Sequence, residues 1–179
     1  MFVDIIICDR RYALANSYEI AEGIASSNRK SEEKEMESLD TVRLLKECDA
    51  GAKMAVTSID EVLEKVCDSE LKSLLQESKA HHERLGNEIH GLLNNYGSEE
   101  KEPSAMAKSM SWMKTTMKMS MDNSDATVAD LITDGCNMGV KSLNRYLNQY
   151  KAADKESQKL CGKLVSIEEQ LCKDLRKYL

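Results

Sequence analysis

All the histidines of this 179-residue chain lie in one short stretch, KAHHERLGNEIHG, which covers residues 79–91. They are His81, His82 and His90, and glutamates, among them Glu88, stand close to them. Imidazoles and carboxylates are common metal ligands in proteins, so the stretch suggests half of a metal site. A single helix with one solvent-exposed face and one buried face would carry the same residue types. The spacing of the surrounding apolar residues distinguishes these two interpretations.

Apolar residues on both sides of the histidines repeat with a helical period. Asp68 is a favourable N-cap and Gly97 a favourable C-terminal residue, so a helix over about residues 69–96 is expected. His82 falls on the apolar stripe, whereas His81 and His90 fall outside it and are expected to face water. The stripe consists of Leu71, Leu75, Ser78, His82, Leu85, Ile89, Leu92 and Tyr96.

An inward His82 needs hydrogen-bond partners, because buried polar groups are almost always paired. Either Ser78, four residues earlier, or a carboxylate of the bundle is expected to be the partner. A metal or ligand contact and a pH-sensitive switch are the alternative roles. His81 lies four residues after Glu77, so these two side chains are expected to pair on the solvent side of the helix.

Three further long helices are expected, over about residues 40–66, 125–150 and 154–178, with a shorter one over about 104–121 that contains Trp112. The chain has only one proline, and 41% of its residues are apolar, which favours helices. We therefore predict an all-α fold: an up-down four-helix bundle with a long crossover that contains the short extra helix. The apolar positions are Leu45, Cys48, Ala52, Ala55, Ile59, Val62 and Val66 in the first helix; Val128, Leu131, Gly135 and Met138 on one side of the third and Ile132, Cys136, Val140, Leu143 and Leu147 on its other side; and Leu160, Leu164, Ile167, Leu171 and Tyr178 in the last.

Residues 1–38 differ from the rest because SSNRKSEEKEMES is highly charged and has little to bury. This segment is expected to be a flexible or mis-annotated N-terminal tail, followed by the bundle over residues 39–179. The four residues before Met36, Glu-Glu-Lys-Glu, can be encoded by purine-rich codons that would resemble a bacterial ribosome-binding sequence. Translation is therefore expected to start at either Met1 or Met36.

Two long hairpins joined by a connection of roughly 30 residues have the layout of ferritin-like bundles. Three stretches, LLKECDAGAKMA, VCDSELKSLLQESKAHHERLGNEI and MSWMK followed by an acid-capped helix, resemble an uncharacterised bacterial ferritin-like family. Its members typically show D-x-E-L-K at the start of the second helix, a crossover tryptophan and a glycine in the third helix. The resemblance covers about residues 40–178. It implies a ferritin-like fold and no established activity.

The usual ferritin-like di-iron centre takes a Glu from each of two helices and a Glu-x-x-His from each of the other two. Here Lys79 stands three residues before His82, and Cys136 stands where the relatives carry an acid after the helix glycine. The last helix contains no histidine. We therefore predict no catalytic residue, no cofactor and no complete metal site. Weak candidate ligands for a degenerate site of this kind are His82, Glu88 and Cys136.

Two other groups of residues have alternative interpretations. Six methionines of the crossover offer soft thioethers for Cu(I), but their helical spacing also suits an apolar packing face: Met106, Met110, Met113, Met117, Met119 and Met121. Glycines inside helices usually permit close helix approach or border a cavity; these are Gly86, Gly135, Gly139 and Gly162.

Composition disfavours several functions. The net charge of −6 gives no cationic face for nucleic acid, and no apolar run approaches the roughly 20 residues that span a bilayer. The six cysteines form no C-x-x-C pair, and the first residues do not resemble a secretion signal, so reduced thiols and a cytoplasmic location are expected.

The function expected from these observations is a non-catalytic ferritin-like bundle with a protein-association or stress-related binding role. Its expected partners are a second copy of the chain or another protein. The alternative is an iron- or copper-binding protein with a degenerate ferritin-like site. A redox-active thiol protein is a third class, because Lys159 and Lys163 flank Cys161 in the sequence.

Overall fold

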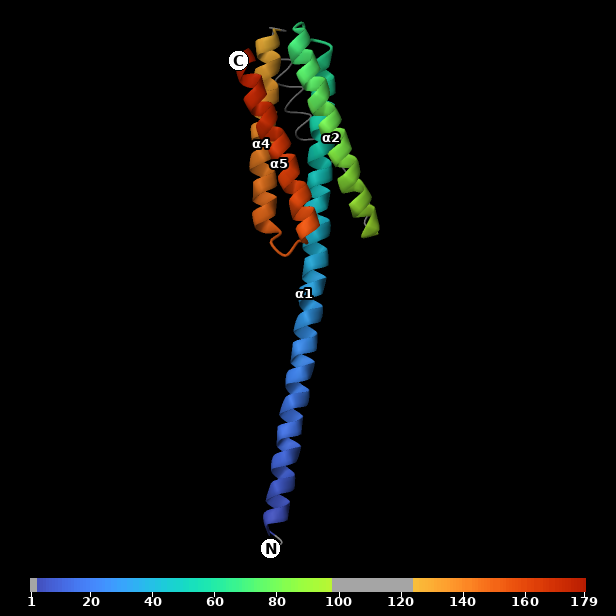
Figure 1. The fold of residues 1–179 in the computed structure, drawn as a ribbon, viewed down its shortest axis with the longest axis vertical. Coiled ribbons are helices and arrows are strands. Elements are labelled where there is room, and N and C mark those ends of the chain that lie inside the picture. The colour runs from blue at the N-terminus through green and yellow to red at the C-terminus, as the bar shows by residue number, and fades with distance from the viewer. Residues whose placement is uncertain (1–2, 98–123) are drawn as a thin grey trace. The chain divides into compact units, whose positions relative to one another are not determined.

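The computed structural model describes the backbone of residues 3–97 and 124–179, and the side chains of residues 26–97 and 124–179. It divides the chain into two compact units, Met1–Ser38 and Leu39–Leu179. The expected all-α class is confirmed, since the described ranges contain helices and no strand (Figure 1). None of the described helices is long and apolar enough to cross a membrane. The helices are α1 (Val3–Leu63), α2 (Ser69–Asn95), α4 (Asp125–Gln149), α5 (Lys155–Leu175) and the short 3-10 helix η1 (Arg176–Tyr178).

Residues 3–38, where a flexible or mis-annotated tail is expected, belong to α1. Every side chain from residue 26 to residue 38 is exposed, Met36 among them. Within this stretch, Ser31 donates a hydrogen bond from its hydroxyl to the carbonyl of Asn28 at 2.7 Å. Helical conformation here reflects strong helix formers such as Glu and Lys, and not burial. The start at Met36 stays a prediction, and the expected crossover helix with Trp112 and its methionines lies outside the described residues.

The ends of the bundle helices follow from local capping. Asp68, Ser124 and Asp154 precede α2, α4 and α5, and each side chain accepts a backbone N–H from the first turn of its helix. Such caps satisfy N–H groups that would otherwise lack a partner. Gly97, with a φ of 62°, follows α2 in the left-handed conformation that favours glycine.

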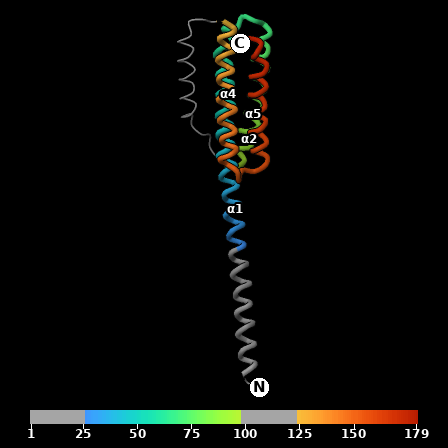
Figure 2. The backbone as a smooth tube through the Cα atoms, turned by 90° about the vertical axis from the view of Figure 1, so that its left-hand side faces the viewer, coloured from blue at the N-terminus to red at the C-terminus, as the bar shows by residue number. Residues whose placement is uncertain are grey.

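Hydrogen bonds between the helix ends define the directions of the four helices in the unit Leu39–Leu179. The Asp125 carboxylate at the start of α4 accepts from the backbone N–H of Cys67 in the α1–α2 turn at 2.8 Å. At the opposite end, Asp154 donates its N–H to the Thr41 hydroxyl of α1 at 2.8 Å and accepts from the Tyr96 hydroxyl at 2.7 Å. Helices α1 and α5 therefore run one way and α2 and α4 the other (Figures 1 and 2). The chain between Gly97 and Ser124 connects opposite ends of the bundle.

The core of this unit largely follows the stripes that the helical spacing predicts. The prediction is wrong for Met138 of α4, which is 49% exposed, and the following predicted residues are only partly buried: Ala55, Val140, Leu147, Ile167 and Tyr178. On α2 the stripe from Leu71 to Ile89 is buried as expected. Its next member is Leu93, which is fully buried, whereas the predicted Leu92 is only partly buried and Tyr96 is 39% exposed. The prediction of Leu92 and Tyr96 as core residues is therefore wrong.

Candidate functional site

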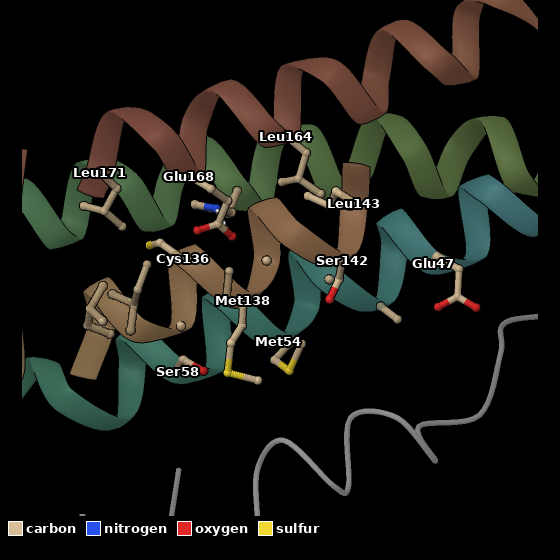
Figure 3. A pocket seen from close by; sticks show the side chains of 18 of the residues that line it. Glu47, Met54, Ser58, Cys136, Met138, Ser142, Leu143, Leu164, Glu168 and Leu171 are labelled. Atoms are coloured by element: carbon tan, nitrogen blue, oxygen red, sulfur yellow. Dashed lines mark hydrogen bonds and ion pairs between the residues drawn. The ribbon is translucent and has the colours of Figure 1, made fainter. Parts of the chain in front are cut away.

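A pocket of about 250 Å³ lies between α1 and α4, and side chains of α2 and α5 complete its lining (Figure 3). Most of the lining is apolar, and the flexible side chains of Met54 and Met138 lie near one another at its edge. The polar side chains are few, as in ligand sites generally. The apolar lining includes Ile59, Leu131, Ile132, Leu143, Leu164 and Leu171.

Helix glycines create the space for this pocket. A Cβ at Gly135 would have no neighbour within 4 Å, and a Cβ at Gly139 would come within 3.2 Å of Glu168 Oε1. Gly139 therefore leaves room for a carboxylate. Gly86 instead permits close approach, because its Cβ would lie 3.3 Å from Cβ of Ala52 on α1. The expectation that these helix glycines serve a cavity or a close approach is confirmed at these three positions.

His82 lies at the inner wall of the pocket and is completely buried. Its Nδ1 is 2.8 Å from the carbonyl oxygen of Ser78 and must carry the proton that this oxygen accepts. Its Nε2 is 3.3 Å from Oε1 of Glu168, a residue of α5 that is only 7% exposed. Of the two alternative partners that the sequence predicts, Ser78 or a bundle carboxylate, the structure shows both, and both ring nitrogens face groups of the protein.

The carboxylate controls the protonation of His82. Burial by itself lowers the pKa of an imidazole, but the hydrogen bond and negative charge of Glu168, together with the Ser78 carbonyl, raise the pKa of His82 above its usual 6.5. The pair is therefore an imidazolium and a carboxylate below that raised pKa. Since the folded-state pKa is raised, the stabilisation is fully present below 6.5 and is lost as pH rises through the folded-state value.

Cys136 of α4 approaches the same carboxylate from another side. Its thiol is 4% exposed, and Figure 3 shows Glu168 and Cys136 close together in the pocket. Burial raises the pKa of the Cys136 thiol strongly, and the charge of Glu168 raises it further. Cys136 is therefore a neutral thiol, whereas nucleophiles and metal ligands are thiolates.

Glu88, the third candidate ligand, does not belong to this group. Its carboxylate oxygens are 3.3 and 3.4 Å from Nζ of Lys163, in an exposed ion pair between α2 and α5. His81 is exposed, as expected. His90 is only partly exposed, and its Nδ1 is 3.8 Å from Oδ1 of the buried Asp49 on α1. The expectation that His90 simply faces water is therefore wrong.

Glu168 is central to the site, although it is not among the candidate residues predicted from the sequence. The sequence does contain a pattern that indicates Glu168. This residue lies four positions after Leu164 and three before Leu171, and therefore on the same face of the helix as these leucines. An acidic residue in an apolar stripe indicates either a distorted stripe or a buried charge with a partner. The structure shows a buried charge with a partner, since Glu168 is paired with His82.

The described side chains form no metal centre of the ferritin-like type. Among them, no group of three or more His, Cys, Asp or Glu residues is placed to hold a metal ion. The candidate methionines of the crossover lie outside the described residues.

Fold and site together define an all-α helical bundle with a largely apolar pocket and a buried imidazole–carboxylate pair in its wall. Comparisons with protein-family models, with curated proteins and with solved structures give no match. The ferritin-like resemblance of residues 40–178 thus stays an expectation from the sequence.

The ion pair makes a prediction for NMR titration of the three histidines. In the wild-type protein, the His82 imidazole should titrate above 6.5. In Glu168→Gln the negative charge is gone while burial remains, so the pKa of His82 should fall below 6.5. The exposed neighbour provides the control, since Glu169→Gln should leave the titration of His82 unchanged. An unchanged pKa of His82 in Glu168→Gln would show that the pair does not form in solution.

Proposed function

We propose that this chain is a non-catalytic ferritin-like helical bundle that acts by binding, and that its ligand occupies the pocket between α1 and α4. The observation that carries this proposal is the pocket itself, about 250 Å³ of largely apolar space with one buried polar pair in its wall. Concave apolar sites with a few convergent polar groups are typical of ligand binding.

The side chains that line the pocket favour ligand binding over catalysis. General acid–base catalysis needs a group whose proton reaches the substrate, yet both ring nitrogens of His82 are directed to Ser78 and Glu168. Nucleophilic catalysis needs an activated group, yet the thiol pKa of Cys136 is raised. Protein association and stress-related binding are the wider roles that we propose, with a second copy of the chain or another protein as partner. The net charge of −6 supports these roles over nucleic-acid binding.

Dye binding tests the pocket as the binding site. Nile red, an uncharged dye that fluoresces in apolar surroundings, should bind the wild-type protein saturably. Gly135→Leu should weaken this binding by at least about tenfold, because leucine fills space that the glycine leaves open and improves helix propensity. Gly162→Leu is the matched control: it also replaces a helix glycine whose Cβ meets nothing within 4 Å, but it lies outside the pocket. Equal binding by Gly135→Leu and wild type would contradict the proposal.

Metal loading tests the alternative of a degenerate iron or copper site. Untagged protein exposed to Fe(II) in air, or to Cu(I) without oxygen, and then desalted should retain well under one metal ion per chain. The expectation follows from the absence of a three-ligand group among the described side chains. Retention of about two irons per chain, the content of a di-iron bundle, would favour the metal-binding alternative instead.

A further inference from the structure

The charge of the pocket lining points to the class of ligand. We infer that the pocket binds a small primary aliphatic amine in its ammonium form, with the alkyl chain on the apolar lining and the ammonium at the carboxylate of Glu168. The inference rests on the proposed function, since it requires that the pocket is a binding site.

Charged side chains are few in the described part of the pocket lining. Among the described residues around the pocket, the acidic side chains are Glu47 and Glu168, and none is lysine or arginine. Within this described lining, His82 is the one side chain that can be a cation, and both its N–H groups are directed at acceptors of the protein, namely the Ser78 carbonyl and Glu168. These described residues therefore offer an anion no charged donor, whereas the Glu168 carboxylate can still accept a hydrogen bond from a cation.

Glu168 is placed to receive this cation. It reaches from α5 into the lining, and the glycine opposite it, Gly139, has no side chain that would cover Oε1. A carboxylate has about four lone-pair sites, and His82 and the Cys136 thiol use two of them. A hydrogen bond from an ammonium to a carboxylate is charge-assisted and about twice as strong as a neutral one.

The remaining lining suits an alkyl chain. Leu131, Leu164 and Leu171 offer apolar surface from two helices, and the unbranched side chains of Met54 and Met138 adapt to chains of different shape. A simple inorganic cation would leave this surface uncovered. A fatty acid would cover it, but its carboxylate would meet Glu168.

Binding of the ammonium is linked to the protonation of His82. His82 contacts the Ser78 carbonyl of its own helix and Glu168 of α5. Cys136 of α4 approaches the same carboxylate as a neutral thiol, and the ionisable lining residue of α1 is Glu47, at the other end of the pocket (Figure 3). Glu168 alone thus balances the imidazolium. An ammonium at the same carboxylate repels the imidazolium and lowers the pKa of His82, so binding releases a proton to water at a pH near that pKa. By reciprocity, affinity for the amine rises with pH.

Calorimetric titration of the full chain tests the inference with ligands that share an apolar body. At pH 8, where an alkylammonium with a pKa of about 10.4 is still charged, octylammonium should bind at least about tenfold tighter than octanol, a factor typical of one charge-assisted hydrogen bond. Octanoate should bind more weakly than octanol. Saturation with octylammonium should lower the pKa of His82 in the NMR titration, and octanol should not.

Variants then assign the effect to one carboxylate. Glu168→Gln should reduce the preference for octylammonium over octanol to within about twofold, whereas Glu169→Gln should retain it. If Glu168→Gln does not fold, the wild-type NMR titration with the two ligands decides the question. Equal binding of octanol and octylammonium would overturn the ammonium inference and leave the proposed binding site intact. Failure of both to bind, with Nile red binding absent as well, would overturn the proposed function.

Discussion

Replacing His82 by leucine should lower the free energy of unfolding by about 3–5 kcal/mol at about pH 6, where an imidazole whose pKa is raised above 6.5 is charged, although leucine has nearly the same volume. The loss arises at Glu168, which is 7% exposed and whose carboxylate loses its imidazolium partner. Removing one member of a buried ion pair leaves an uncompensated charge, which costs more than the pair contributes. If His82 were paired with Ser78 alone, the same replacement would give a small loss or a gain, because it would leave no buried charge behind.

The double variant His82→Leu with Glu168→Leu distinguishes loss of the charged partner from poor packing of the new leucine side chain. Apolar replacement of both partners in a buried pair is often neutral or stabilising, so the double variant should lie within about 1 kcal/mol of wild type or above it. His81→Leu, at an exposed neighbouring position, should change stability by less than about 0.5 kcal/mol. Urea denaturation with a common m value measures all of these. A single variant as stable as the double one would show that the pair does not form.

The site shows which parts of the structure follow from the sequence. Helical spacing correctly places His82 inside, because membership of an apolar stripe depends only on residues of the same helix. The partner of His82 depends on how α2 and α5 are rotated and aligned, and Glu168 is 86 positions away in the chain. No local sequence pattern specifies how the two helices align. The sequence therefore predicts that a carboxylate can pair with His82, but not which residue supplies it.

The helix glycines likewise show which features the sequence predicts and which require the structure. Their location inside helices predicts that each serves a close approach or a space, but the choice depends on the facing element. Gly86 faces the Cβ of Ala52, and Gly139 faces the carboxylate of Glu168. A pocket between α1 and α4 therefore could not be placed from α4 alone, although Gly135 and Gly139 are both visible in its sequence.

A larger loss of stability from Leu93→Ala than from Leu92→Ala would establish the register at the end of α2. Leu93 is fully buried and Leu92 only partly, so Leu93→Ala should cost about 2–5 kcal/mol. Leu92→Ala, which removes the same atoms one position away, should cost less than about 1.5 kcal/mol. Urea denaturation of the two variants under identical conditions makes the comparison.

The physical reason for this order is the pitch of the helix. At about 100° per residue, the step of four from Ile89 to Leu93 departs from the axis of the stripe by about 40°, and the step of three to Leu92 by about 60° in the other direction. A strict alternation of three and four, which selects Leu92, holds for helices that supercoil around one partner. The buried Leu93 means that α2 packs here as an ordinary helix against several neighbours. The opposite order of losses would show that the stripe continues through Leu92 and that α2 is rotated away from the Leu93 side at its end.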